Sequence, residues 1–434
     1  MSEWSKVRLS AVAEIRFSNV DKRTSPGEVS IQLCNYMDVY GNAGYVTNDL
    51  PFMQASASTV EIERFRVERG DVLLTKDSET PDDIGIPAVV AEDIPNLVCG
   101  YHLALIKLRR GQIDSVYLAK QLGSQPTARY FARLANGSTR YGLSSSSIAC
   151  TVIPLAPLPQ QRRIAEVLST VDEAIEQAEA LIAKYQQIKA GLMHDLFTRG
   201  ITPDGHLRPA RTQAPQLYKD SPLGWIPKEW EVVRIADAFD IQLGKMLNKF
   251  AKTGKLSAPY LGNRAVQWDF VDISAVEVMD FDSYERQKFS LLPGDLLICE
   301  GGEVGRTAMW RGEIDGCYYQ KAIHRLRPKS ASTLPAFMLR FMRFARDNGS
   351  FREFTSQSSI AHLTQEKLGS IGMLLPSLDE QRNIAERLDA LDGFIQTEKA
   401  KLAKLRQQKH GLMQDLLTGR VRVRVKVGET EMPV

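Results

Sequence analysis

Two stretches of this chain repeat each other at a separation of 220 residues, and this duplication constrains the fold more than any other feature. Residues 161–200 and 381–420 align without a gap and share 19 of 40 residues. Both contain Gln-Arg-x-Ile-Ala-Glu near their start and Gly-Leu-Met near their end. Such self-similarity predicts two copies of one structural unit within the 434 residues.

The repeat continues upstream, where the spacing between matching residues drifts. Trp4 matches Trp230, and Gly70-Asp71 matches Gly294-Asp295, in each case before an apolar run. The Gly-Asp pairs are expected to form turns. Drifting spacing means insertions and deletions, which belong in loops. The N-terminal part of each copy has therefore diverged while its C-terminal part has stayed similar. This suggests one kind of scaffold that holds two different targets.

The similar ends are predicted to be long helices that pair with each other. Their apolar residues follow the three-and-four spacing of a heptad repeat. About 36 residues form a rod of about 54 Å, longer than a small domain is wide, which favours pairing over a helix lying on its own domain. The apolar positions are Ile164, Leu168, Val171, Ile175, Ala178, Ile182, Tyr185, Leu192 and Leu196, then Ile384, Leu388, Leu391, Ile395, Leu402, Leu405, Leu412 and Leu416.

Two residue types recur at matching places in these helices. Lys189 and Lys409 occupy equivalent seam positions and are expected to help fix one alignment of the partners. Gly191 and Gly411 also match, although glycine costs about 1 kcal/mol inside a helix. Their recurrence predicts a close backbone approach or a bend.

The diverged N-terminal parts of the two copies are predicted to be mixed α/β modules. Short apolar or alternating runs predict strands at 72–74, 102–108, 296–299 and 322–326, and helical periodicity covers 115–134 and 334–354. A stretch with Pro203, Pro209, Pro215 and Pro222 reads as a linker. The expected order is a first module (1–155), first long helix (156–200), linker (201–226), second module (227–376), second long helix (377–420) and C-terminal tail (421–434).

Composition places the chain among globular proteins without membrane spans. Apolar residues make up 43% and charged residues 25%, and no run approaches the roughly 18 apolar residues of a membrane helix. The start shows no signal peptide. Five scattered cysteines lack the spacing of a zinc or redox motif, so a reduced, cytoplasmic protein is expected.

The distribution of charge, rather than the net charge of +3, points to nucleic acid. No Asp or Glu occurs within 115–165 or within 241–268, although both stretches carry basic and aromatic residues. Such stretches suit a phosphate backbone with bases beside it, and the alternative is a plain solvated face. The candidate DNA-contacting residues are Arg140, Tyr141, Lys245, Lys249, Lys252 and Arg264.

The motifs of several enzyme classes are missing from the sequence. There is no glycine-rich methyl-donor turn with an Asn/Asp-Pro-Pro-aromatic segment, and no phosphate-binding Gly-Lys-Ser/Thr. No His-Glu-x-x-His or paired His/Cys ligand set is present. The chain is therefore expected to catalyse nothing and to hold neither a cofactor nor a metal.

These motifs, in this order and twice over, resemble the specificity subunit of type I restriction-modification systems. They are a Trp-x-x-x-Arg-Leu/Ile start, the Gly-Asp-hydrophobic strand and the Gln-Arg-x-Ile-Ala helix with its Gly-Leu-Met. The junction Leu223-Gly-Trp-Ile-Pro followed by Trp230 is also similar to that family. One departure is Leu158-Pro159-Gln160 where the second copy has Leu378-Asp379-Glu380, and it is expected to affect only the start of the helix.

The resemblance implies two target recognition domains, each reading one half of a split double-stranded DNA sequence, with the two helices packed as an antiparallel coiled coil. It implies two DNA methyltransferase (modification) subunits as partners, and motor-nuclease (restriction) subunits as further ones. S-adenosylmethionine, ATP and Mg would belong to those partners. The helices would set the distance between the half-sites.

Two other interpretations remain open from the residues. The chain could be a helical adaptor that binds proteins rather than DNA. It could also serve a related split-target system whose partner fuses nuclease and methyltransferase. Neither the target bases nor the length of the gap between half-sites follows from the sequence.

Overall fold

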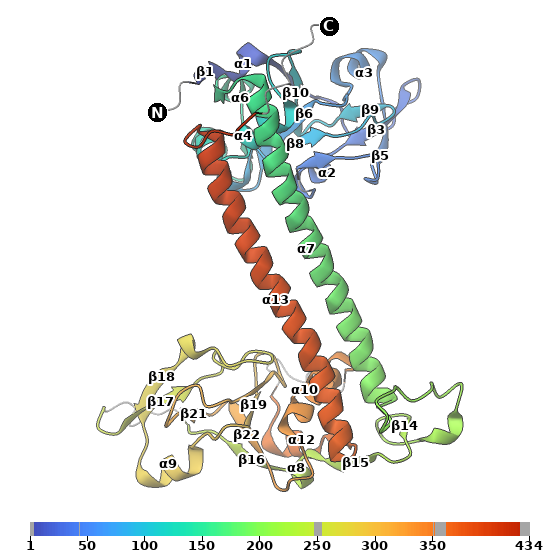
Figure 1. The fold of residues 1–434 in the computed structure, drawn as a ribbon, viewed down its shortest axis with the longest axis vertical. Coiled ribbons are helices and arrows are strands. Elements are labelled where there is room, and N and C mark those ends of the chain that lie inside the picture. The colour runs from blue at the N-terminus through green and yellow to red at the C-terminus, as the bar shows by residue number, and fades with distance from the viewer. Residues whose placement is uncertain (1–3, 43, 247–253, 350, 352–361, 426–434) are drawn as a thin grey trace. The chain divides into compact units, whose positions relative to one another are not determined.

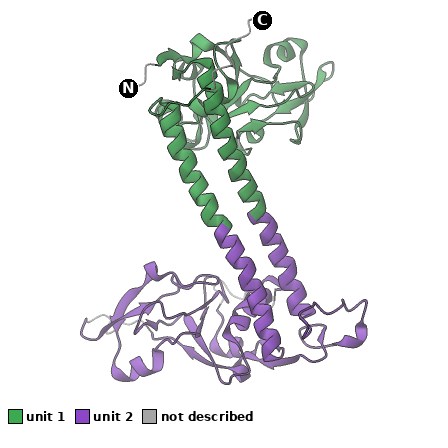
Figure 2. Cartoon of the chain, in the orientation of Figure 1, with its two compact units in different colours: residues 1–181, 398–434 green, residues 182–397 purple. Residues whose placement is uncertain are grey.

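The computed structural model describes residues 4–42, 44–246, 254–349, 351 and 362–425. The chain divides into two compact units (Figure 2), residues 1–181 with 398–434 as unit 1 and residues 182–397 as unit 2. Each unit contains one α/β module together with a stretch of both long helices (Figure 1).

The first module is built on two sheets. A five-stranded sheet has the order β2-β10-β6-β8-β4, and a three-stranded sheet has the order β5-β3-β9. The strands are β2 (Ala13–Phe17), β3 (Val29–Cys34), β4 (Tyr45–Val46), β5 (Met53–Ala57), β6 (Val72–Thr75), β8 (Pro87–Val90), β9 (Leu97–Cys99) and β10 (Leu103–Leu108). Two short ladders join β1 (Ser5–Arg8) to β12 (Val152–Leu155) and β7 (Asp77–Ser78) to β11 (Tyr141–Gly142).

Short helices connect these strands. They are α1 (Leu9–Val12), α2 (Tyr36–Tyr40), α3 (Thr59–Phe65), α4 (Ser115–Leu122), α5 (Gln125–Leu134) and α6 (Ser145–Ala149). The helical periodicity predicted over 115–134 is confirmed, but it is interrupted between α4 and α5 at Gly123 and Ser124.

The second module repeats this plan. Its main sheet has the order β16-β22-β19-β20, and its smaller sheet has the order β18-β17-β21. The strands are β15 (Glu231–Arg234), β16 (Phe239–Leu243), β17 (Ser257–Leu261), β18 (Glu277–Asp280), β19 (Leu296–Cys299), β20 (Thr307–Met309), β21 (Tyr318–Tyr319), β22 (Ile323–Pro328) and β23 (Gly372–Leu375). The helices are α8 (Ile235–Ala238), α9 (Ser283–Phe289), α10 (Pro335–Asp347) and α12 (Gln365–Ser370).

Each module has two hydrophobic cores, one on either face of its main sheet. Successive residues of a strand point to opposite faces, so Val72 and Leu74 join the core beside the helices while Leu73 joins the core between the sheets. Leu297 takes the corresponding place in the second module, between residues that face the other core. Burial on both faces explains why these strands are unbroken apolar runs.

The two long helices are α7 (Leu158–Thr198) and α13 (Leu378–Leu417), and they run antiparallel in both units. In unit 1, Asp172 lies 2.6 Å from Lys409 and Glu179 lies 2.6 Å from Arg406. In unit 2, Tyr185 stacks on Phe394 and Lys189 lies 2.5 Å from Asp392. In each unit the partner number falls along α13 as the number rises along α7, which confirms the predicted pairing.

The matching lysines, Lys189 and Lys409, form matching ion-pair clusters. That they fix one alignment of the helices stays a prediction. Lys409 pairs with Asp172, which also pairs with Lys120 of α4. In the other unit, Lys189 pairs with Asp392, which lies 2.9 Å from Arg340 of α10. Each module therefore presents a cation to an aspartate of its own long helix, and the opposite long helix supplies a lysine.

The close backbone approach predicted at the recurring glycines is wrong. A Cβ atom placed on Gly191 or Gly411 would meet no atom within 4 Å. Both glycines lie inside continuous helix, so neither is needed to admit a neighbouring segment of this chain.

The expectation that the change from Gln160 to Glu380 affects only a helix start is also wrong. Glu380 is 7% exposed, forms a buried ion pair with Arg208, and accepts hydrogen bonds from the indole of Trp230 (2.9 Å) and the backbone N–H of Ile201 (2.7 Å). The carboxylate thus fastens the proline-rich linker, which includes β13 (Tyr218–Lys219) and β14 (Ile226–Pro227), to the second module.

Candidate nucleic-acid interface

Several loops of the first module meet at the end of its sheets. Residue Tyr141 pairs with Ser78 in the β7–β11 ladder, and the His102 ring lies 2.8 Å from the Asp77 carboxylate. The hydroxyl of Tyr36 bonds to Ser78. We call the surface formed by Tyr36, Asp77, Ser78, His102, Arg140 and Tyr141 the first-module edge.

Local hydrogen bonds hold the loop that carries Arg140. Asn136 and Gly142 exchange two backbone hydrogen bonds of 3.0 and 2.9 Å, and the N–H of Leu143 donates to the carbonyl of Lys76 at 2.8 Å. Burial raises the pKa of the nearby Tyr36 hydroxyl above its usual value. The hydrogen bonds close the loop between Asn136 and Gly142, and the loop presents Arg140 to solvent.

The structure brings Arg140 and Tyr141 into one surface with residues from three other chain segments. Arg140 is exposed, Tyr141 is half-buried, and Arg140 is close enough to Tyr36 to act electrostatically on its hydroxyl. The acid-free stretch that pointed to them is not one face, however. Its Lys120 is 9% exposed and pairs with Asp172, so part of the basic run stabilises the module instead.

The second module places an aromatic and basic group at the corresponding position. Arg264 follows Asn263 at the end of β17, just as Tyr36 follows Asn35 at the end of β3. Arg264 is exposed, and the indole N–H of Trp268 donates to Glu303 at 2.6 Å. The guanidinium groups of Arg343 and Arg346 lie 4.9 and 5.0 Å from the centre of the Trp268 ring. We call the surface formed by Asn263, Arg264, Trp268, Arg343 and Arg346 the second-module edge.

Of the three predicted lysines of the second module, the structure describes Lys245, which is paired within the protein. Lys245 turns inward: its ammonium donates to Glu285 and to the carbonyl of Asp280, both at 2.6 Å. Glu285 belongs to the capping box of α9, as Glu61 belongs to that of α3, where Asn19 donates to it. Lys245 therefore connects the start of α9 to the main sheet of the second module. Lys249 and Lys252 lie outside the described residues.

Sequence reasoning did not single out Tyr36 or His102, and it noted Trp268 only as one of the aromatic residues of the acid-free stretch 241–268. Tyr36 carried a usable signal, because it follows an asparagine that recurs in both copies at a strand end. His102 had no local pattern, since it meets Asp77 across more than 20 residues of chain.

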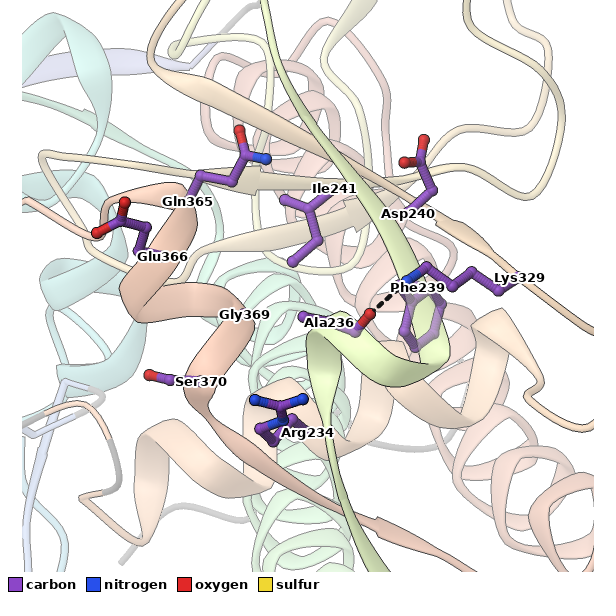
Figure 3. Close-up of a pocket in the computed structure, with 10 residues that line it drawn as sticks. All are labelled: Arg234, Ala236, Phe239, Asp240, Ile241, Lys329, Gln365, Glu366, Gly369 and Ser370. Carbon is purple, nitrogen blue, oxygen red and sulfur yellow. Dashed lines mark hydrogen bonds between the residues drawn. The ribbon is translucent and has the colours of Figure 1, made fainter.

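A separate hollow of about 710 Å³ lies beside α8, β16 and α12 of the second module (Figure 3). Its charged groups are mostly engaged with the protein. Lys329 donates to the carbonyl of Ala236 at 2.6 Å, Arg234 pairs with Asp237 at 2.8 Å, and Asp240 pairs with Arg325 at 2.7 Å. These partners leave the hollow little free charge to offer a ligand.

In the part of the chain that the structure describes, no group of three or more His, Cys, Asp and Glu side chains is arranged to hold a metal ion. None of the helices in this part is both long and apolar enough to cross a membrane.

Two similar α/β modules, each joined to a long helix that pairs with the other, define a duplicated scaffold in which each copy has an exposed arginine beside aromatic side chains at one edge. The family described as type I restriction modification DNA specificity domain matches the chain twice, over residues 1–186 and 227–407. The chain belongs to this family.

Individual relatives are distant but similar over most of their length. The chain is 24% identical to a type I restriction enzyme specificity subunit, MjaX, of Methanocaldococcus jannaschii, over 84% of this chain and 81% of that protein. It is 26% identical to the MjaVIII specificity subunit of the same organism, over 63% of this chain and 62% of that protein. The crystal structure of a type I restriction-modification S subunit from M. genitalium has a TM-score of 0.58 at 17% identity and covers 96% of both chains. That structure shares the fold described above.

Proposed function

We propose that the chain is the specificity subunit of a type I restriction-modification complex, and that each module reads one half of a split double-stranded DNA target. The observation that carries the proposal is the family match in two copies, on modules whose edges differ in residue type. A duplicated frame with different edges suits the recognition of two unlike half-sites.

The residues proposed to contact DNA lie on the two edges. Arg140 and Tyr141 serve the first module, with Tyr36 beside them, and Arg264 serves the second. Tyr36 and Arg264 occupy equivalent positions, so this position is a candidate specificity determinant. An arginine can make two hydrogen bonds to a guanine edge, whereas a tyrosine cannot. Lys249 and Lys252 are proposed to contact phosphates, and Lys245 is proposed to have a structural role.

The chemistry is assigned to partners. The chain would direct two DNA methyltransferase subunits, and motor-nuclease subunits where they are present, to the target, and it would catalyse nothing itself. S-adenosylmethionine, ATP and Mg would bind those partners in the cytoplasm. The absence of a methyl-donor motif and of a phosphate-binding Gly-Lys-Ser/Thr from the sequence supports this division.

Exchange of one module tests the proposal. Residues 1–155 are replaced by the corresponding module of a relative, and methylated sites are mapped across a genome that carries the complete complex. One half-site is expected to change while the other and the gap stay the same. Loss of both specificities in a folded complex would refute modular reading. Absence of sequence-specific, salt-sensitive DNA binding would favour the protein-binding adaptor.

Single substitutions test the edges. Arg264→Ala is expected to cost about 1–3 kcal/mol of discrimination at one base position of the second half-site. Arg311→Ala removes an exposed arginine of the same module that lies outside the edge, and it should leave that discrimination unchanged. Equal effects of both substitutions would place the reading surface elsewhere.

A further inference from the structure

Unit 1 contains a cavity of about 550 Å³ between the first module and the end of α13. Its floor includes Gln121, Ser124 and Leu417, all buried, and its rim carries Lys6, Arg129 and His410, all exposed. We call this space the first-module cavity. Its volume is within the range of pockets that bind small molecules.

The second module shows what fills the equivalent space there. The N–H of Asp114 donates to Gln161, and the N–H of Leu334 donates to Gln381, both at 2.8 Å, so α4 and α10 start at equivalent positions 220 residues apart. By this equivalence Gln121, Ser124 and Leu417 correspond to Phe341, Phe344 and Phe197.

Those three phenylalanines pack against one another. The ring centre of Phe197 lies 4.9 Å from that of Phe344, with the rings stacked, and 6.0 Å from that of Phe341. The first module replaces the three benzyl groups with smaller or polar side chains, and the break between α4 and α5 falls at the same place. The cavity therefore lies where the related module holds aromatic rings of its own.

The charged side chains that line the first-module cavity are Lys6 and Arg129, and no Asp or Glu lines it. His410 also lines the cavity, and none of the three pairs with a carboxylate among the residues that the structure describes. The first turn of α5 contains no acidic residue and no side chain caps it, which adds to the positive potential.

One buried polar group faces this space with an unused acceptor. Gln121 is 4% exposed, and its amide N–H donates to the Tyr117 hydroxyl and the Leu417 carbonyl, both at 2.8 Å. These bonds fix the orientation of the amide. Its Oε1 has no partner among the described residues, so it is left to accept a hydrogen bond from a molecule in the cavity.

We propose that the first-module cavity binds a small molecule that joins a flat aromatic ring to an anionic group. The ring would occupy the space that phenylalanines fill in the second module, an amino group on the ring would donate to Gln121, and the anion would lie between Arg129, Lys6 and His410. A partner protein present in two equal copies is disfavoured, because the second module fills this position with Phe341, Phe344 and Phe197. The anion can be a phosphate, as in a nucleoside monophosphate, or a carboxylate.

Calorimetric titration of the full chain without DNA tests the proposal, with adenosine monophosphate, adenosine and 4-aminobenzoate as probes. At least one anionic probe is expected to bind with a stoichiometry of one. Adenosine should bind about tenfold more weakly than its monophosphate, because it lacks the charge-assisted contacts. Binding of only adenosine monophosphate identifies a phosphate ligand, and binding of only 4-aminobenzoate identifies a carboxylate ligand.

Two variants locate the binding. Ser124→Phe restores the aromatic residue of the second module and should abolish binding. Arg129→Gln should weaken it about tenfold, while Arg133→Gln, an exposed control on the same helix outside the cavity, should not. If the Ser124→Phe variant does not fold, the comparison of Arg129→Gln with Arg133→Gln tests the proposal by itself. The proposal is overturned if neither anionic probe binds, or if binding is unchanged in the cavity variants.

Discussion

Glu380 shows that a single residue difference between the two copies can connect segments that are far apart in the sequence. Its carboxylate contacts Arg208, Trp230 and the backbone of Ile201, three points that are far apart in sequence. The equivalent Gln160 has no such set of partners, and its Oε1 is a buried acceptor without a hydrogen bond. A residue that reads as a helix-start variation thus fixes the linker to one module.

Glu380→Gln is expected to destabilise unit 2 by about 2–3 kcal/mol, because it leaves the buried Arg208 guanidinium without its main counter-charge. Thermal unfolding of the full chain measures the loss. Asp379→Asn, whose side chain is 87% exposed, is the matched control and should change the melting temperature little. Equal melting temperatures for the two variants would show that the ion pair contributes nothing measurable.

At the element scale, the long helices take part in both the cores and the pairing. Ile164 and Leu168 of α7 lie in the core of the first module, and Leu196 and Phe197 lie in a core of the second. Between these ends, the helices depend on a thin apolar seam and on ion pairs. Only the start of α7 therefore packs on its own module; its other end packs on the second module, and the helices pair between these ends.

Lys189→Glu should destabilise the helix pair by about 1–3 kcal/mol, since it replaces a partly buried ion pair with two like charges. Lys184→Glu makes the same charge change at an exposed position of α7 and is the control. The comparison is made by chemical denaturation. A similar midpoint for both variants would mean that Lys189 does not set the register.

Gly191→Ala should stabilise α7 by about 1 kcal/mol and raise the melting temperature by about 2–4 °C, because the added methyl meets no neighbour and alanine favours helix. Gly369→Ala is the contrasting variant, because its Cβ would lie 3.1 Å from that of Ala236. If Gly191→Ala does not raise the melting temperature, the glycine is required for a contact that this structure does not contain.

At the scale of the whole molecule, both long helices cross from one compact unit to the other, between residues 181 and 182 and between 397 and 398. These two points are the natural places to change the spacer. One extra heptad in each helix preserves the apolar pattern of the seam on both sides of the insertion.

Inserting one heptad at both points is expected to lengthen the gap between half-sites by about three base pairs, because seven helical residues rise about 10.5 Å. Mapping of methylated sites measures the gap. A heptad inserted in one helix alone is the control and should abolish methylation, since the seam loses its register. An unchanged gap in the double insertion would show that the helices do not set the spacing.

Local patterns in the sequence are sufficient to predict the duplication, the two long helices and the strands that begin after Gly70-Asp71 and Gly294-Asp295. These patterns are heptad spacing, apolar runs and turn residues. The repeat also predicts that Lys189 and Lys409 lie on equivalent faces of the two helices, but not that Asp392 and Asp172 are their partners.

Which charges are free becomes clear only once the chain is folded. Lys120 and Lys245 look like surface cations in sequence, yet aspartate and glutamate from distant segments neutralise them. Arg140 acts electrostatically on Tyr36, about a hundred residues away in sequence, and the first-module cavity depends on Ser124 lying near Leu417. These outcomes depend on electrostatics and packing, which act through space, whereas periodicity records only which face of an element is buried.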